Sequence, residues 1–308
     1  MKHTFTVPLL TQPTRLDKFV HEALPEFSRT ALQQAIKRGA ITVNGKRVTV
    51  HHFLKADDRI DIQDLAEPKH PAVEPNPQVA WRLVEETPDY LIVEKPSGLV
   101  VHPAEGVKQP TLVDGLLARF PELAGVGEDP LRPGIVHRLD REVSGLMVVA
   151  RNQAMYQTLK QQFQARTIEK QYTALVVGRM TQPSGTINFP LARSKRQHGK
   201  MAARAQADED TREAVTHYTV VREFQQVTLL KVKLETGRTH QIRAHLAALG
   251  YPLVGDQLYR PKKLSLKASP GRIFLHASAL TFTDLTGAPR SFVSELPPDL
   301  HDFLSTLS

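Results

Sequence analysis

The spacing of apolar side chains near the start of the chain predicts two helices. Residues 15 to 24 place apolar groups on one helical face, namely Leu16, Phe19, Val20 and Ala23. Ser28 is a residue type favoured at the N-cap of a helix, and Gly39 is typical of the position just after a helix end. We therefore expect a second helix between Ser28 and Gly39.

Strand-like spacing follows these two helices. Residues 41 to 43 and 46 to 48 are expected to pair as a hairpin, because the Asn44-Gly45 pair between them is favoured in type I′ turns. A further short strand is expected at residues 59 to 62. Together the helices and strands predict a compact α/β unit at this end of the chain.

The later part of the chain is richer in strands. Five segments have the composition and spacing of strands: residues 90 to 94, 146 to 150, 172 to 177, 215 to 222 and 227 to 234. Three helices are also expected: one capped by Thr111, one with Met155, Leu159 and Phe163 on one face, and one with Ile242, Leu246 and Leu249. Because strands and helices do not alternate regularly, the pattern favours an α+β fold over a doubly wound parallel sheet.

A proline-rich segment divides the chain. Residues 67 to 78 contain Pro68, Pro71, Pro75 and Pro77 and almost no large apolar side chain, which is typical of an extended, semi-rigid tether. We therefore expect a small domain at residues 13 to 66, a linker at residues 67 to 78 and a larger domain at residues 79 to 308.

Composition narrows the class of protein. The 308 residues include 40 Lys and Arg against 32 Asp and Glu, which gives a formal net charge of +8, and no Cys. The charge favours a polyanionic partner, either a nucleic acid or an anionic membrane surface. The lack of Cys excludes disulfides, thiolate catalysis and cysteine-ligated metal sites. No apolar run approaches the roughly 18 residues of a membrane span, and the first ten residues do not resemble a signal peptide, so we expect a cytoplasmic protein without membrane contact.

The sequence lacks the Walker A, GxGxxG, HExxH and GxSxG motifs. Its densest polar group lies in residues 135 to 150, where His137, Arg138, Asp140 and Arg141 precede a hydrophobic strand. Two flanking guanidinium groups would favour the charged form of Asp140, which could then act as a nucleophile or a base. A surface turn with internal salt bridges and a His-x-x-Asp metal site are the alternatives.

A second polar segment lies at residues 234 to 246, where a strand is expected to lead into a helix. Backbone N–H groups, Arg238 and Arg243 could converge there on one anion, either a phosphate or a carboxylate such as Asp140. An amphipathic helix with a solvated basic end has the same pattern. We expect two histidines of this segment to be hydrogen-bonded structural residues rather than metal ligands: His240 and His245.

Other residues point to RNA. Tyr172 is expected at the rim of a sheet beside small residues, where its ring could stack on a planar base, although most strand tyrosines simply pack. Basic surfaces on both sides of a tether suit an extended, folded polyanion such as RNA. We expect RNA contacts from Arg29, Lys37, Arg38 and Lys46, from Arg193, Lys195, Arg196, Lys200 and Arg204, and from Arg138, Arg141, Arg238 and His240.

Taken together, these segments resemble a known family. Residues 137 to 146, with the sequence HRLDREVSGL, are similar to the signature of the RluA/RluD-type ribosomal large-subunit pseudouridine synthases. Further segments are similar to its other motifs in the expected order: Glu94 to Pro103, Tyr172 in its strand, Thr236 to Arg243 and Leu253 to Tyr259. Residues 15 to 62 resemble the S4 RNA-binding domain that the D-type members carry. The resemblance implies a catalytic domain with a large mixed, mainly antiparallel β-sheet flanked by helices.

The resemblance also implies a reaction. The chain would isomerise specific uridines of 23S ribosomal RNA to pseudouridine by base flipping, with Asp140 as the catalytic aspartate and no metal or organic cofactor. Tyr172 would pack against the target base, Arg243 would pair with Asp140, and Arg138 would enter the space that the flipped nucleotide leaves. Whether the carboxylate attacks the sugar or removes a proton from it stays open. Val143 stands where the family usually has Thr, so a turn hydrogen bond from that hydroxyl is lost.

Two other functions remain open from the sequence. A non-catalytic RNA-binding or assembly factor would use the S4-like unit alone and leave no modified nucleotide. A metal-dependent phosphohydrolase would use His102, His137 and Asp140 as ligands. We expect ribosomal RNA as the partner and a monomeric chain.

Overall fold

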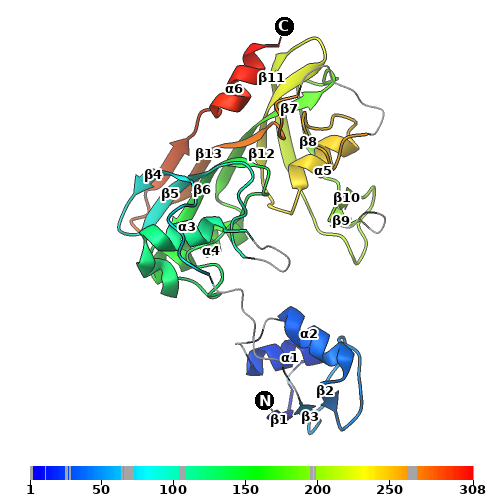
Figure 1. Cartoon of the computed structure of the whole chain (residues 1–308). Helices are drawn as coiled ribbons and strands as arrows, with labels where there is room; N and C mark the ends of the chain where they lie inside the picture. Colours follow the sequence, from blue (N-terminus) through cyan, green and yellow to red (C-terminus); the bar gives the residue numbers. More distant parts are fainter. Residues whose placement is uncertain are drawn as a thin grey trace. The chain divides into compact units, whose positions relative to one another are not determined.

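The computed structural model divides into two compact units, Met1–Ala72 and Val73–Ser308 (Figure 1). It describes residues 3–10, 12–24, 27, 29–63, 65, 73–103, 109–194, 197, 199–261 and 269–307. Several residues named above lie outside this part of the chain: Ser28, Lys195, Arg196, Pro68 and Pro71, together with the side chain of Arg29.

The smaller unit contains both expected helices beside a three-stranded antiparallel sheet of order β1-β3-β2. Its elements are β1 (His3–Thr6), α1 (Leu16–Ala23), α2 (Arg29–Arg38), β2 (Ile41–Val43) and β3 (Arg59–Ile62). The apolar faces of the helices and strands meet in one buried cluster that includes Leu16, Val20, Leu32, Ile41 and Ile60. The helical spacing in the sequence therefore selects the residues that form this core.

One expectation for this unit is wrong. The Asn44-Gly45 turn forms, with positive φ at both residues (52° and 72°), but the strand expected at residues 46 to 48 does not. Lys46 makes one isolated bridge, and β2 pairs with β3 instead. The chain leaves the sheet after this bridge because Val48 packs against the core of the unit.

The larger unit is built on one nine-stranded sheet in the part of the chain that the structure describes, with the order β4-β5-β6-β13-β7-β12-β11-β8 and β14 paired to β13. Its strands are β4 (Arg82–Glu86), β5 (Tyr90–Lys95), β6 (Ser144–Ala150), β7 (Glu169–Val177), β8 (Ser184–Ile187), β11 (Thr216–Glu223), β12 (Val227–Leu234), β13 (Leu275–Thr283) and β14 (Pro289–Val293). Among the strand pairs of this sheet in the described residues, β6 with β13 is the parallel one. The expected α+β class with a mixed, mainly antiparallel sheet is confirmed.

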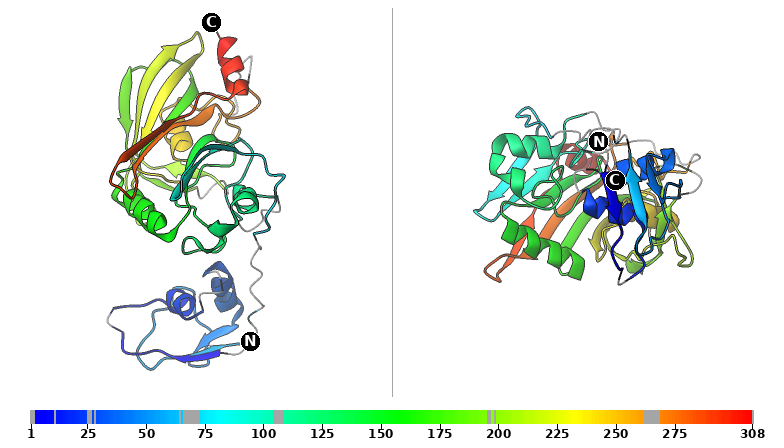
Figure 2. Two further views of the ribbon diagram at one scale, coloured as in Figure 1. Left: turned by 90° about the vertical axis from the view of Figure 1, so that its left-hand side faces the viewer. Right: turned by 90° about the horizontal axis from the view of Figure 1, so that it is seen from below.

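Helices cover both faces of the central strands. The remaining elements are α3 (Leu112–Arg119), the 3₁₀ helix η1 (Pro121–Gly125), α4 (Gln153–Ala165), α5 (Gln241–Ala248), α6 (Pro298–Ser305) and the hairpin of β9 (Leu191–Arg193) with β10 (Met201–Ala203). In Figure 2, α3 and α4 lie on opposite sides of β5 and β6, and each packs against its own buried cluster. All seven residues of β6 are buried for this reason, which explains its continuous apolar run. Across the described residues, no helix is long and apolar enough to span a bilayer.

The start of β6 is fixed by close contact with β13. Gly145 has a φ of 122°, and a Cβ atom at this position would lie 2.3 Å from the carbonyl oxygen of Ala277. Only glycine fits this approach without strain. Ser144, one residue earlier, is hydrogen-bonded to the buried ring of His276 at 2.9 Å. These contacts fix the point at which the polar segment that precedes β6 joins the sheet.

Candidate active site

Asp140 lies in the loop that leads into β6. The loop follows an isolated bridge between Ile135 and Val149, and Leu139 and Val143 anchor it in the core. The N–H group of Val143 donates to the carbonyl oxygen of Asp140 at 3.1 Å, so a backbone hydrogen bond closes the turn although Val143 has no hydroxyl group. The Asp140 side chain remains 16% exposed. Its carboxylate can therefore meet a substrate.

A buried lysine holds the Asp140 loop to the segment after β5. Lys95 Nζ donates to the carbonyl oxygens of Pro96 and Leu99, both at 2.8 Å, and of Arg141 at 3.1 Å. Burial, helped by the charge of Arg272, lowers the pKa of Lys95 to about 7. Because three carbonyl oxygens from two segments accept from this single group, Lys95 fixes the position of the loop that carries Asp140.

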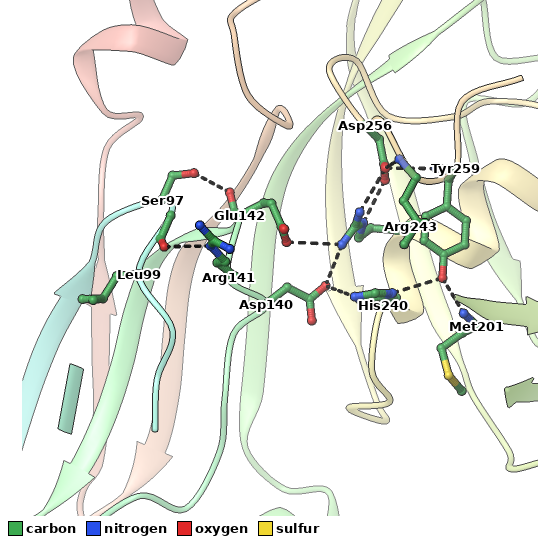
Figure 3. A network of polar contacts seen from close by, with 12 residues as sticks. Ser97, Leu99, Asp140, Arg141, Glu142, Met201, His240, Arg243, Asp256 and Tyr259 are labelled. Atoms are coloured by element: carbon green, nitrogen blue, oxygen red, sulfur yellow. Dashed lines mark hydrogen bonds and ion pairs between the residues drawn. The ribbon is translucent and has the colours of Figure 1, made fainter. Parts of the chain in front are cut away.

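The arginine beside the Asp140 carboxylate is Arg243 of α5 (Figure 3). Arg243 Nη1 lies 3.6 Å from Asp140 Oδ2 and 3.5 Å from Glu142 Oε2. The other edge of the guanidinium donates to the fully buried Asp256, with 2.8 Å from Nε to Oδ2 and 3.0 Å from Nη2 to Oδ1. Asp256 thus fixes the plane of the guanidinium, and the remaining nitrogen faces Asp140.

Arg141 does not flank the carboxylate, contrary to the expectation from its place in the sequence. Its Nε donates to the carbonyl oxygen of Gly98 at 3.1 Å, and Ser97 donates to the neighbouring carbonyl of Glu142 at 2.7 Å. The side chain is therefore used to join the loop to the segment after β5. The backbone turns at this point, so the side chains of Asp140 and Arg141 point to different sides of the loop. Neighbouring positions in the sequence do not specify such a turn.

His240 approaches the same carboxylate oxygen of Asp140 as Arg243 does. Its Nε2 lies 3.9 Å from Asp140 Oδ2, and its Nδ1 lies 3.2 Å from the hydroxyl of Tyr259 (Figure 3). The backbone N–H of Met201 donates to the same hydroxyl at 2.8 Å. Burial raises the pKa of Tyr259 to about 12, so the phenol keeps its proton and can donate it to Nδ1. This arrangement favours the His240 tautomer whose Nε2–H points to Asp140.

Tyr172 and Asp140 line one small hollow of about 80 Å³, together with Arg138, Arg238 and Arg243. Tyr172 lies on β7 on the same face as Ala174 and Val176, as expected. Burial raises the pKa of the Tyr172 phenol, with the negative charge of Asp140 adding to the effect. The hollow thus combines an aromatic ring, a carboxylate and guanidinium groups, which suits a planar base attached to a sugar phosphate.

The other residues expected to contact RNA are spread over both units. Arg238 Nε donates to the carbonyl oxygen of Glu213 at 3.0 Å. On the β9–β10 hairpin, Arg193 is exposed and Lys200 Nζ lies 4.8 Å from the ring centre of Tyr259. The last expected contact of this region is Arg204, whose Nε is buried without a hydrogen-bond partner in the described part of the chain. The smaller unit carries Lys37 and Arg38 in the last turn of α2 and Lys46 after its turn.

The residues of the metal hypothesis are not brought together. His137 Nε2 accepts the N–H of Val148 at 3.1 Å, and its ring stacks on Phe163 with 4.8 Å between the ring centres. No group of three His, Asp or Glu residues suited to a metal ion occurs among the described residues. His245 is buried and hydrogen-bonded to Thr216 and the carbonyl of Phe189, which agrees with the structural role expected for it.

Comparisons with known proteins agree with this geometry. Residues 89 to 248 match the model of a family described as RNA pseudouridylate synthase, and residues 14 to 60 match the S4 domain. The chain belongs to the RNA pseudouridylate synthase family, and it is an isomerase that acts on RNA. The family resemblance seen in the sequence is thereby confirmed.

Individual relatives extend this result. The ribosomal large subunit pseudouridine synthase D of Xanthomonas campestris is 38% identical over 98% of this chain and 91% of the relative. An RNA pseudouridine synthase of Bacillus subtilis is 38% identical over 95% of this chain and 94% of the relative. Among solved structures, human RNA pseudouridylate synthase domain containing 4 superposes with a TM-score of 0.59 at 26% identity, covering 73% of this chain and 93% of that one.

Several residues that build the site were not singled out from the sequence. Lys95 ends an apolar strand, and no pattern marks its ammonium group as buried. Asp256 and Tyr259 lie in a segment that only the family resemblance drew attention to. The signal that could have found them is an acidic and an aromatic residue in a turn after an apolar segment, which is too common to identify a site.

Proposed function

We propose that this chain converts uridines of large-subunit ribosomal RNA to pseudouridine in the cytoplasm, as a monomer. The relatives named for that activity in Xanthomonas campestris and Pseudomonas aeruginosa, at 38% and 37% identity, support this substrate. In this proposal residues 13 to 66 bind RNA, residues 67 to 78 are a linker and residues 79 to 308 catalyse the reaction. The basic residues Arg138, Arg141, Arg238 and His240 are assigned to the RNA surface of the larger unit.

In this reaction the uracil base is detached from its ribose and is then reattached to the ribose through a different ring atom. The C–N glycosidic bond of uridine breaks, the uracil turns while it stays bound, and a C–C bond forms at C5, after which the C5 proton is lost. We assign to Asp140 the carboxylate that attacks the sugar or removes its proton. Tyr172 holds the uracil by its ring face, and Arg138 fills the space that the flipped nucleotide leaves.

One observation carries the proposal: Arg243 and His240 both approach Oδ2 of the Asp140 carboxylate in the hollow that Tyr172 lines. The Arg243 guanidinium faces the carboxylate, and Asp256 keeps Arg243 in place. The enclosed position limits the escape and hydrolysis of a detached base. A protein that only bound RNA would not need a carboxylate here, since its negative charge opposes phosphate.

The test is Asp140→Asn in the full chain. Ribosomal RNA labelled with tritium at C5 of uridine releases tritium when pseudouridine forms. We expect Asp140→Asn to lower this release at least about a thousandfold, while RNA binding is retained or slightly tighter, because shape is kept and charge is removed. Asp302→Asn, the same change at a largely exposed site on α6, is the matched control and should be neutral. Normal release by Asp140→Asn would refute the catalytic assignment.

Mapping the substrate separates this enzyme from a non-catalytic assembly factor. A strain that lacks the gene should lose pseudouridine at one or more sites of 23S ribosomal RNA, detected by bulky-adduct primer extension. Unchanged modification of that RNA would contradict the substrate assignment. Tritium release should also be undiminished by EDTA, and inhibition by EDTA would revive the phosphohydrolase hypothesis.

A further inference from the structure

A second and larger hollow of about 580 Å³ adjoins the one that contains Asp140. The two hollows share Arg138, Tyr172 and Arg238 in their walls, so they lie side by side. The walls of the larger hollow contain six Lys and Arg side chains and one carboxylate, Glu235. A molecule that occupies it next to a base on Tyr172 therefore meets a strongly positive surface.

Half of these cations already have a carboxylate partner. The ion pairs are Arg132 with Asp129, Lys160 with Glu128 and Arg166 with Glu213. The carboxylate of Glu235 is taken by His217 at 2.6 Å. Three cations in the wall have no carboxylate partner among the described residues: Arg138, Lys170 and Arg238. Positive charge in this hollow is therefore not balanced by the chain itself.

Lys170 is the most informative of the three. Its side chain is buried, with 9% of the residue exposed, and in the part of the chain that the structure describes it has neither a hydrogen bond nor an ion pair. Its Nζ lies 5.5 Å from the ring centre of Phe163. Burial lowers the pKa of Lys170, with the nearby charge of Arg166 acting in the same direction. Most of the Lys170 side chain is buried in the wall of the hollow, and its ammonium group has no counter-ion among the described residues, so it is suited to meet an anion that a ligand supplies there.

Lys170 lies close to the residue that would hold the target base. Lys170 and Tyr172 are two residues apart on β7, so their side chains leave the same face of the strand. A nucleotide whose base lies against Tyr172 has its phosphates at the edge of the base-binding hollow. The neighbouring ammonium group of Lys170 can meet a phosphate there without any change in the strand.

His102 adds a neutral polar group to the same wall. It is 3% exposed, and its Nδ1 atom is buried without a hydrogen-bond partner among the described residues. Burial, with the charges of Arg132 and Arg138, lowers the pKa of His102 to about 4, so the ring is neutral at neutral pH. A neutral imidazole can donate to a phosphate or sugar oxygen, or accept from a 2′-hydroxyl group.

We propose that Lys170 and His102 form a phosphodiester subsite that holds the sugar–phosphate backbone next to the target uridine. This inference rests on the proposed function, because it assigns the substrate of the same site. An RNA backbone is favoured over a free anion because the larger hollow adjoins the base-binding hollow and shares wall residues with it. One continuous strand can then occupy both.

The test compares Lys170→Met with Lys231→Met in the full chain. Lys231 is exposed on the neighbouring strand β12, and its sequence neighbours Leu230 and Val232 lie in the core that Tyr172 joins, so it faces the opposite side of the sheet. Both changes remove one positive charge from the same sheet. KM and kcat are measured by tritium release from a 23S ribosomal RNA transcript at several salt concentrations, and thermal unfolding is followed without RNA.

We expect Lys170→Met to raise KM roughly tenfold at about 0.1 M salt and to change kcat little. The slope of log KM against log salt concentration should fall by about one relative to Lys231→Met, since one phosphate contact is lost. The unfolding midpoint should stay close to that of the wild type, because Lys170 makes no hydrogen bond or ion pair among the described residues that the change would remove. Lys170→Arg should restore most of the affinity.

Two results would overturn the subsite. Equal KM and equal salt slopes for the two variants would show that Lys170 meets no phosphate. A lowered unfolding midpoint in Lys170→Met, with no rescue of KM by Lys170→Arg, would assign a structural role instead. Failure of the proposed function is distinguishable, because the wild type itself would then release no tritium from ribosomal RNA. Filter binding of the same transcript would still measure the salt slope.

Discussion

Asp256→Asn is a small change in volume with a large expected effect on stability. Asp256 Oδ2 accepts from Arg243 Nε, and Oδ1 accepts from Arg243 Nη2 and from the backbone N–H groups of Leu258 and Tyr259. All four donors face the carboxylate. An asparagine amide must place its NH₂ group on one side, so at least one N–H donor then meets another donor.

The size of the effect follows from burial. The Asp256 side chain is fully buried and that of Arg243 is 5% exposed, so the guanidinium cannot regain water when its partner loses charge. Breaking a buried ion pair on one side costs about 3 to 5 kcal/mol. Because Asn keeps part of the hydrogen bonding, we expect a loss at the lower end, about 3 kcal/mol, in the free energy of unfolding of the larger unit. The unfolding midpoint should fall by roughly 6 to 12 °C.

The assay is thermal and urea unfolding of the full chain, with Asp140→Asn as the matched control. Asp140 also contacts Arg243, at 3.6 Å, but it is partly exposed and serves the substrate. Its amide variant should therefore keep the wild-type midpoint and lose activity. Asp256→Asn should lose stability and also activity, because Arg243 is released from its fixed plane. If Asp256→Asn unfolds at the wild-type midpoint, the argument that Asp256 fixes Arg243 is refuted.

Two further predictions concern buried groups of the larger unit. Burial lowers the pKa of His102 and of His276 from 6.5 to about 4. Between pH 6.5 and pH 4 the unfolded chain therefore binds more protons than the folded chain does. The free energy of unfolding should be highest above pH 6.5 and should decrease as the pH falls toward 4. At pH 5 each histidine should lower the free energy of unfolding by about 2 kcal/mol relative to its value above pH 6.5. Urea unfolding at pH 7.5 and at pH 5 measures this difference, and equal free energies at the two pH values would contradict the prediction. Gly145→Ala should destabilise by about 3 kcal/mol or more and lower tritium release, since its Cβ would lie 2.3 Å from the Ala277 carbonyl oxygen. Gly125→Ala, where nothing lies within 4 Å, should do neither.

The local spacing of apolar residues was sufficient to predict helices and strands, but it was not sufficient to predict which strands pair with each other. The helical spacing at residues 15 to 24 and the apolar run of β6 correspond to observed elements because each depends on which faces of one segment are buried. The strand expected at residues 46 to 48 failed because pairing depends on which distant segment supplies the other strand. In this case β3 takes that place, and the chain after Lys46 turns toward the core.

The active site was also predicted only in part from the sequence. The sequence by itself determined that a carboxylate at position 140 precedes a buried strand, and its motifs determined the family. It also indicated Arg141 as a neighbour of that carboxylate, and the structure directs Arg141 to Gly98 instead. The sequence left open whether Arg238 and Arg243 meet a phosphate or a carboxylate such as Asp140, and the family resemblance then implied the pair of Arg243 with Asp140.

Tertiary structure alone decided which groups surround Asp140. Lys95 comes from the end of a strand, His240 from the start of a helix and Asp256 from a turn, and each contacts the site or a residue that supports it. No local pattern encodes such contacts, since they depend on how β6 meets β13 and on where α5 begins relative to the sheet. The unbalanced charge of Lys170 likewise becomes visible only when burial is known, because a lysine in a strand usually reaches water.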